Sequence, residues 1–322
     1  MSVVEKKLML FTGTVNVELA ESVSKILGIP LGDIRLEKFA NGEIYARYNE
    51  SVRGDSVYLM QSVSGEVNDA LMELLIMADA AKRASARSVT AVLTHYGYAR
   101  QDKKSAAREP ITAKLVANLY EAAGIDRIIT IDLHQGQIQG FFDIPVNHLT
   151  ALSLFADYFK AKGFNHDELV VVSPDMGRAK AAKKLADLID CSIAIMHKGR
   201  PQHNVAEITS VIGDVKGKTC IINDDMIDTA GSIIAGVKAL KEMGAGDIYV
   251  SATHGLLSGP AIERIEGADI KEVVVTDAVP VPQEKRIEKI KVISVAPLFA
   301  QAISNVFNDK SVSDLFDPNF AL

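Results

Sequence analysis

The chain has 322 residues, of which 48% are hydrophobic and 24% are charged, and its 35 basic and 41 acidic residues leave a net charge of −6. This composition excludes a largely disordered chain, and the acidity excludes a general electrostatic affinity for nucleic acid or for an anionic membrane. Two cysteines, no secretory signal pattern and no apolar run long enough for a membrane span predict a reduced, cytoplasmic protein.

Short apolar segments alternate with longer amphipathic ones along the chain. The predicted strands are Leu8–Phe11, Val57–Met60, Val89–Thr94, Ile128–Ile131, Leu169–Val172, Ile193–Met196, Thr219–Ile222, Ile248–Ala252 and Glu272–Val275. The predicted helices are Asp69–Ala84, Thr112–Ala123, Ala179–Leu188 and Ser232–Met243, with a further one near Leu298–Phe307. Strands rich in Val and Ile with little polar alternation are typical of burial on both faces. The predicted fold class is therefore α/β, with parallel sheets flanked by helices.

Two distant segments resemble each other. Ala78–His95 aligns without gaps with Val237–His254, and each contains the end of a helix, a turn and a strand that closes on Thr-His. We interpret this as a duplicated α/β unit with a boundary near Pro145–Thr150, although any two helix–turn–strand units share some features. The predicted domains are residues 1–148 and 149–300, followed by a C-terminal helix and tail, 301–322, that pack back on the first domain.

The strongest local signal follows the predicted strand Thr219–Ile222. Asp224, Asp225 and Asp228 precede small residues, a hydroxyl and the start of a helix. A helix N-terminus reached through small residues favours a phosphate, and paired carboxylates accept hydrogen bonds from sugar hydroxyls. This combination predicts a phosphorylated sugar as ligand. A simple helix cap by Asp228 or Thr229 is the alternative, but it does not explain three acids in five residues.

The matching loop of the first copy, Ser62–Asp69, has no adjacent pair of acids. If the duplication is correct, only the second copy keeps the sugar-phosphate site. The first copy is then free for another ligand or for assembly.

Two basic segments also follow predicted strands. Tyr98–Lys104, with Arg108–Lys114 after it, carries five basic groups that either grip a polyphosphate or form a solvated loop. Met196–Pro201 contains Lys198 and Arg200 together with a Gly and a Pro, which fits a closing loop or an exposed hairpin tip.

Candidate metal ligands follow two other strands. Asp175 lies in Ser173-Pro-Asp and has the hard oxygen atoms that Mg²⁺ prefers when it bridges phosphates. His134 lies in Asp132-Leu-His, and its imidazole is an unusual ligand for Mg²⁺, so a structural role is the alternative.

Seven motifs resemble those of class I ribose-phosphate diphosphokinases, the phosphoribosyl pyrophosphate synthetases. They are Phe39–Glu43, Asn49–Gly54, Tyr98–Asp102, Asp132–His134, Gln137–Asp143, Val172–Asp175 and Asp224–Ser232. The resemblance spans essentially the whole chain and implies two duplicated type I phosphoribosyltransferase-like domains, the first for ATP and assembly and the second for ribose 5-phosphate. It also implies transfer of the β,γ-diphosphoryl group of ATP to the C1 hydroxyl of ribose 5-phosphate, which supplies purine, pyrimidine, histidine and NAD synthesis.

The resemblance further implies roles for single residues. The implied ATP-binding residues are Phe39, Asn41, Gly42, Glu43, Arg100 and Gln101, and the implied catalytic residues are Lys198 and Arg200. His134 and Asp175 are implied ligands or near neighbours of Mg²⁺. The implied ribose 5-phosphate site is Arg200, Asp224, Asp225, Asp228, Thr229, Ala230, Gly231 and Ser232, and the implied pyrophosphate loop is Asp175, Met176, Gly177 and Arg178. A hexamer activated by phosphate and inhibited by ADP is implied, with regulatory positions Ser51, Arg53, Ser311, Ser313 and Phe316.

The chain departs from the family pattern at four positions that lie in or beside the implied sites. Arg178 replaces a common glycine and either adds a phosphate contact or points outward, Asn41 replaces the commoner Asp, Gly199 stands where a basic residue is frequent, and Ser232 replaces Thr. Two other functions remain open at this point. A catalytically silent regulatory subunit is disfavoured by Lys198 and the acid loop, and a phosphoribosyltransferase is disfavoured by the ATP-type motifs of the first half.

Overall fold

The computed structural model describes residues 6–202 and 205–315. For residues 198–202, 205–209 and 314 it describes the backbone only. The chain divides into two compact units. The first comprises Met1–Thr150, Ala278–Pro280 and Ser294–Leu322, and the second comprises Ala151–Asp277 and Val281–Ile293. None of the helices in the described ranges has the length and apolarity that crossing a membrane requires.

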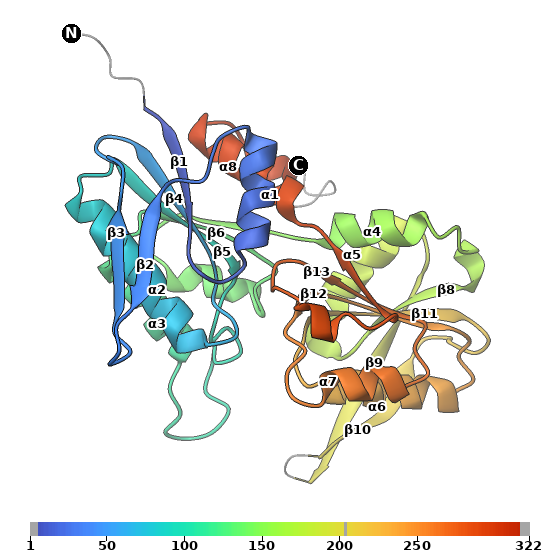
Figure 1. The fold of residues 1–322 in the computed structure, drawn as a ribbon. Helices are drawn as coiled ribbons and strands as arrows, with labels where there is room; N and C mark the ends of the chain where they lie inside the picture. Colours follow the sequence, from blue (N-terminus) through green and yellow to red (C-terminus); the bar gives the residue numbers. More distant parts are fainter. Residues whose placement is uncertain (1–5, 203–204, 316–322) are drawn as a thin grey trace. The chain divides into compact units, whose positions relative to one another are not determined.

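The first unit is built on a five-stranded, fully parallel sheet with the order β1-β4-β5-β6-β7. Its strands are β1 (Leu8–Thr12), β4 (Ser56–Ser62), β5 (Ser88–His95), β6 (Arg127–Ile131) and β7 (Val146–Leu149). A separate antiparallel hairpin consists of β2 (Ile34–Lys38) and β3 (Ile44–Tyr48). The helices of this unit are α1 (Val17–Leu27), α2 (Val67–Arg83), α3 (Thr112–Ala122) and α8 (Ala296–Phe307) (Figure 1).

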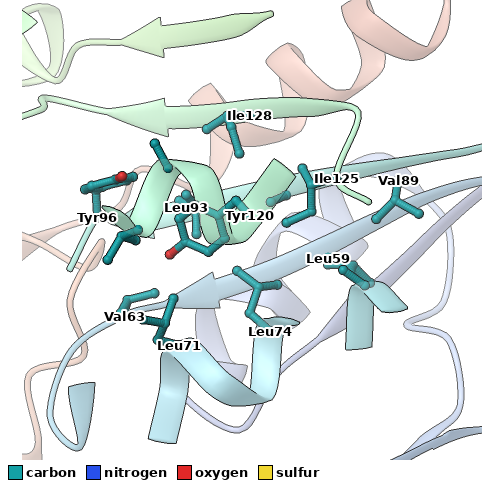
Figure 2. Close-up of a cluster of buried hydrophobic side chains, with 14 of the residues drawn as sticks. Leu59, Val63, Leu71, Leu74, Val89, Leu93, Tyr96, Tyr120, Ile125 and Ile128 are labelled. Atoms are coloured by element: carbon teal, nitrogen blue, oxygen red, sulfur yellow. The ribbon is translucent and has the colours of Figure 1, made fainter. Parts of the chain in front are cut away.

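Apolar side chains fill the space between the first sheet and helices α2 and α3. Figure 2 shows Leu74 of α2 and Tyr120 of α3 within the cluster that also contains Leu59, Leu93 and Ile128 of the strands. Burial of such side chains is the main favourable term in folding. On α1 and α8 the buried side chains are not part of this cluster, and the two helices pack against each other. The strands are therefore buried on both faces, as the Val- and Ile-rich sequence predicts.

The second unit contains a seven-stranded sheet with the order β10-β9-β8-β11-β12-β13-β14. Its strands are β8 (Leu169–Ser173), β9 (Ser192–Gln202), β10 (Val205–Ile212), β11 (Thr219–Ile227), β12 (Ile248–Gly255), β13 (Glu272–Thr276) and β14 (Ile290–Ile293). Only the β9–β10 pair is antiparallel among the described strand pairs of this sheet. The helices are α4 (Leu152–Lys160), α5 (Ala179–Ile189), α6 (Gly231–Glu242) and α7 (Ala261–Gly267).

The two halves of the chain repeat one order of elements. The first runs β1-α1-β2-β3-β4-α2-β5-α3-β6-β7-α4, and the second runs β8-α5-β9-β10-β11-α6-β12-α7-β13-β14-α8. The central strand orders match as well, because β1-β4-β5-β6-β7 corresponds to β8-β11-β12-β13-β14. This repetition confirms the predicted parallel α/β fold and its duplication.

The last helix of each repeat belongs to the unit formed by the other repeat. Helix α4 follows β7 but packs against α5 in the second unit, and α8 follows β14 but packs against α1 in the first. Helices α1 and α5 are the matching first helices of the two repeats. Each unit is therefore completed by a segment of the other repeat.

All nine predicted strands and the five predicted helices are present, and the differences lie elsewhere. The sequence analysis omitted β2, β3, β7, β10 and β14 and the helices α1, α4 and α7. Most of the omitted strands are short or only partly buried, so their apolar pattern is weak. Strand β11 continues to Ile227, five residues beyond the predicted end at Ile222.

Replacement of Phe299 tests the contribution of α8 to the first unit. Phe299 is fully buried in α8, so Phe299→Ala is expected to lower the free energy of unfolding by about 3–5 kcal/mol. The exposed neighbour Gln301 is the control, and Gln301→Ala is expected to change it by less than about 0.5 kcal/mol. Urea unfolding followed by circular dichroism measures both, and equal effects of the two substitutions would contradict the packing described here.

Candidate active site

The paired acids lie inside strand β11 and not after it, which corrects the sequence-based prediction. Asp224 pairs with Ala252 of β12, whereas β8 accompanies β11 only as far as Ile222. Beyond Ile222, β11 therefore has a paired neighbour on one side only. Asp225 is 2% exposed, and the side chain of Asp224 is 18% exposed.

Arg178 is the cationic partner of this acid pair. Its Nε atom lies 3.8 Å from Oδ1 of Asp224, and its side chain is only 16% exposed. Burial, followed by the neighbouring Asp225 carboxylate, raises the pKa of Asp224 to about 7, and Arg178 acts in the opposite direction by lowering it. The structure therefore excludes the outward orientation of Arg178, whose side chain faces Asp224, and the phosphate contact stays a prediction.

The loop that supplies Arg178 holds itself in place through Asp175. The Arg178 N–H donates to Oδ1 of Asp175 at 3.1 Å, and the Ser173 hydroxyl donates to the Asp175 carbonyl at 2.7 Å. A Cβ on Gly177 would lie 3.2 Å from the same Oδ1 atom, so glycine fits best here. Met176 is 59% exposed. The predicted pyrophosphate loop is thus a compact turn between β8 and α5.

The segment from Asp228 to Ser232 leads directly into α6. Ala230 has a left-handed backbone with φ of 60°, and α6 begins at Gly231. The first N–H groups of a helix have no partner within the helix, so they are available to an anion. Ser258 donates its N–H to the Asp228 carbonyl at 2.9 Å, which ties this segment to the end of β12.

Arg264 is a residue of this region that the sequence analysis missed. From α7, it donates Nη1–H to the Thr229 carbonyl at 2.8 Å. The two residues are 35 positions apart, and no local motif marks Arg264. The contact fixes the backbone of the predicted phosphate cradle from outside the motif.

In the first unit, the predicted adenine-binding residues form the tip of the β2–β3 hairpin. The Phe39 N–H donates to the Glu43 carbonyl at 2.8 Å, and Oδ1 of Asn41 accepts the Glu43 N–H at 3.2 Å. Gly42 has φ of 93°, a conformation that favours glycine. Phe39 is 52% exposed, with its ring centroid 5.8 Å from that of Tyr45. An exposed ring on a fixed turn is suited to stacking on a flat base.

Arg100 and Gln101 lie in the segment between β5 and α3. Arg100 is exposed, and the Gln101 side chain accepts the Thr112 hydroxyl proton at 2.6 Å. The Ala113 N–H donates to the Gln101 carbonyl at 3.1 Å, so Gln101 ties this segment to the start of α3.

His134 follows β6 in a turn that a second histidine supports. Asp132 has φ of 37°, and the Leu133 N–H donates to Nε2 of His148 at 2.9 Å. His134 lies in the first unit and Asp175 in the second. In the described ranges, no three His, Cys, Asp or Glu side chains gather where they could hold a metal ion.

The backbone of Lys198 and Arg200 lies in strand β9, whereas the sequence analysis favoured either a closing loop or a hairpin tip. Lys198 pairs with Ile208 of β10, and register shifts interrupt this pairing. The backbone of both residues is thus in a strand that pairs antiparallel with β10.

Of the predicted regulatory residues, Ser51 and Arg53 are exposed and share a turn. The Arg53 N–H donates to the Ser51 hydroxyl at 3.4 Å, and Nη1 of Arg53 donates to the Ser85 hydroxyl at 3.2 Å. Ser311 and Ser313 follow α8, and the Ser311 hydroxyl donates a hydrogen bond to the Ser313 hydroxyl at 3.0 Å. Phe316 lies outside the described residues.

Comparison with known proteins places these features in a family. The model of the N-terminal domain of ribose phosphate pyrophosphokinase matches residues 8–124, and the model of the phosphoribosyl synthetase-associated domain matches residues 203–317. The ribose-phosphate pyrophosphokinase of Bacillus caldolyticus is 53% identical over 98% of this chain and 100% of its own length. That of Fusobacterium nucleatum subsp. nucleatum is 51% identical over 96% of this chain and 98% of its own.

A solved structure gives the same result for the fold. The phosphoribosylpyrophosphate synthetase of Mycobacterium smegmatis is 47% identical, with a TM-score of 0.89 over 94% of this chain and 100% of its own. This confirms the resemblance seen in the seven motifs. The chain belongs to the ribose-phosphate pyrophosphokinase family.

Proposed function

We propose that the chain transfers the diphosphoryl group of ATP to ribose 5-phosphate and releases AMP. The C1 hydroxyl oxygen attacks the β-phosphorus, the bond from that phosphorus to the bridging oxygen breaks, AMP leaves with that oxygen, and the hydroxyl proton passes to water. The observation that carries the proposal is the acid pair Asp224 and Asp225 beside the start of α6, in a chain similar to ribose-phosphate pyrophosphokinases over nearly its full length.

Ribose 5-phosphate is assigned to the second unit. The carboxylates of Asp224 and Asp225 accept hydrogen bonds from the ribose hydroxyls, and the backbone N–H groups from Asp228 to Ser232 bind the 5-phosphate. Arg200 completes this site. Arg178 lies next to Asp224, where its positive charge offsets part of the repulsion between the carboxylates and an incoming phosphate.

ATP is assigned mainly to the first unit. Phe39 stacks on the adenine, the hairpin tip with Asn41, Gly42 and Glu43 supports it, and Arg100 and Gln101 bind the remainder of the nucleotide. Hydrogen bonds fix the hairpin tip and also the segment that contains Gln101, which reduces the ordering cost of binding.

Magnesium is the proposed cofactor. The carboxylate of Asp175 is a ligand of the type that Mg²⁺ prefers. The imidazole of His134 is a softer ligand, so His134 is less suited than Asp175 to bind Mg²⁺ directly. Bound Mg²⁺ would neutralise charge on the phosphate oxygens. Lys198 and Arg200 would stabilise the charge that develops on the transferred group.

Assembly and regulation follow the family expectation. We infer a homohexamer with phosphate as activator and ADP as inhibitor, which bind near Ser51, Arg53, Ser311, Ser313 and Phe316. The hydroxyl and guanidinium groups of Ser51 and Arg53 are suited to bind phosphate oxygens. An enzyme that consumes ATP and a sugar phosphate fits the cytoplasm, where we place it.

The direct test is AMP release from ATP with ribose 5-phosphate, Mg²⁺ and phosphate, followed by chromatography with each component omitted in turn. Sugar-dependent AMP is the expected result, and dependence on phosphate is expected from the proposed regulation. Release of ADP in place of AMP would contradict diphosphoryl transfer. A folded chain that turns over no nucleotide would favour the silent regulatory subunit.

Replacement of Lys198 tests the proposed charge stabilisation. Lys198→Ala is expected to lower kcat by about 10²–10³-fold, because it removes one cation from the developing charge. The KM for ribose 5-phosphate is expected to change little. Lys238→Ala, which removes an exposed lysine of α6, is the control and is expected to leave steady-state AMP release unchanged. Near-normal turnover of the Lys198 variant would contradict this role.

Replacement of Asp224 is expected to separate stability from activity. Because the pKa of Asp224 is about 7 in the folded chain and near 3.8 otherwise, the folded state loses stability as the pH rises from about 4 through 7. Asp224→Asn is therefore expected to melt at a higher temperature than the unaltered chain at pH 8, with no difference near pH 4. Its KM for ribose 5-phosphate is expected to rise about tenfold to a hundredfold.

The control for Asp224 is the exposed Asp247, which pairs with Lys271 at the surface. Asp247→Asn is expected to change neither the pH dependence of melting nor the KM. Thermal unfolding across pH 4–8 and initial rates provide both measurements. An Asp224 variant with unchanged KM would remove this residue from the sugar site.

A further inference from the structure

Strand register allows each position of the first repeat to be matched with one of the second. Gln61 of β4 lies opposite Leu93 of β5, and Asp224 of β11 lies opposite Ala252 of β12. Leu93 and Ala252 are matching positions of the two segments that align in sequence. Gln61 therefore occupies the position of Asp224.

Two further positions match in the same way. Thr14 is the second residue after β1, and Asp175 is the second residue after β8, in strands of equal register. Glu73 in α2 matches Ser232 in α6 when the alignment of Ala78–His95 with Val237–His254 is extended toward the start of the two helices, which also end at matching residues, Arg83 and Glu242. Three positions that carry proposed ligand-binding residues in the second repeat thus hold Thr14, Gln61 and Glu73 in the first.

These three residues of the first repeat bind one another. Oε1 of Glu73 accepts the Thr14 N–H at 2.7 Å and Nε2–H of Gln61 at 2.8 Å. Oε2 of Glu73 accepts the Thr14 hydroxyl proton at 3.0 Å. Oε1 of Gln61 accepts the Val15 N–H at 3.3 Å. Gln61 is fully buried and Glu73 is 5% exposed, so the donors of the loop after β1 are used by the protein itself.

The space around this network is filled. A Cβ on Gly13 would lie 2.4 Å from Nε2 of Gln61 and 2.6 Å from Oε1 of Glu73. Only glycine at this position lets the loop approach the two side chains so closely.

The helix geometry of the first repeat differs in the same region. Helix α6 begins at Gly231, whereas α2 begins at Val67, so the position that matches Gly231 is Met72, inside α2. Backbone N–H groups inside a helix are bonded to carbonyls of the preceding turn. The first repeat therefore has no helix N-terminus where the second repeat has its proposed phosphate cradle.

We propose that Glu73 is a built-in anion that closes the ligand site of the first repeat. Its carboxylate oxygens accept the loop N–H and side-chain donors that phosphate oxygens would otherwise accept, so that sugar phosphate and pyrophosphate bind only to the second repeat. This inference rests on the proposed function for the place of those ligands in the second repeat. The sequence analysis expected the first copy to be free for another ligand. With Glu73 in the matching site, we place that ligand, ATP, at the tip of the β2–β3 hairpin.

Removal of the carboxylate is expected to open an anion site. In Glu73→Ala, the donors of Thr14 and Gln61 surround a space that the side chain occupied. Titration calorimetry with inorganic pyrophosphate, without divalent cations, is expected to give one more bound pyrophosphate per chain than the unaltered protein. Asp79→Ala removes one negative charge from the exposed face of the same helix and is expected to add no site.

Two further variants keep the test decisive. Glu73→Ser introduces the residue found at the matching position of the second repeat and is expected to add the same site. It serves as the test if Glu73→Ala does not fold. Glu73→Gln keeps the space filled and is expected to add none. A folded Glu73→Ala or Glu73→Ser variant with unchanged stoichiometry, or an added site in Glu73→Gln, would overturn the proposal. Failure of the proposed function would instead appear as the absence of sugar-dependent AMP release by the unaltered chain.

Discussion

Parallel pairing of the strands is the constraint on which the arrangement of functional residues depends. When strands run parallel, their carboxyl ends meet at one edge of the sheet, and each strand must be followed by a crossover segment. In the second unit this edge receives the loop after β8 with Arg178, the end of β11 with Asp224 and Asp225, and the start of α6. This pairing brings the loop after β8 to the same edge as the end of β11 and the start of α6, although that loop is distant from them in the sequence.

The acid pair lowers the stability of the folded chain, and Arg178 offsets part of this effect. Two adjacent carboxylates in a buried strand repel each other and lose hydration, which is why the pKa of Asp224 is raised. Arg178 lies close enough to attract Asp224 but too far for a hydrogen bond, so the carboxylate keeps its capacity for other donors. Sites that bind ligands often retain such unfavourable local features, because the ligand relieves them. In the first repeat, by contrast, Gln61 stands at the position of Asp224. The Glu73 carboxylate there accepts hydrogen bonds from Thr14 and Gln61 of the same unit.

The sequence was sufficient to predict the main elements and to mark the motifs of the candidate site, but not to predict certain contacts between distant residues. The Val- and Ile-rich strands and the amphipathic helices have strong periodic patterns, and the local motif from Asp224 to Ser232 could be recognised without a structure. The continuation of β11 through the acids could not, because polar residues at a strand end look like a loop until a neighbour such as β12 pairs with them. Arg264 and His148 were missed because each acts on a motif from a distant part of the chain.

By itself, the sequence determined the α/β class, the duplication, the acid-rich motif from Asp224 to Ser232 and the family resemblance, since these depend on residue types and on short spacings. Only the tertiary structure decided that Arg178 faces Asp224, that β9 and β10 pair around Lys198, and that α4 and α8 each complete the unit of the other repeat. It also decided that Glu73 binds Thr14 and Gln61. Three of these features depend on contacts between residues distant in sequence, which pairing and burial select only when the whole sheet has formed. The β9–β10 pairing is local, but its interrupted register cannot be read from the residue pattern.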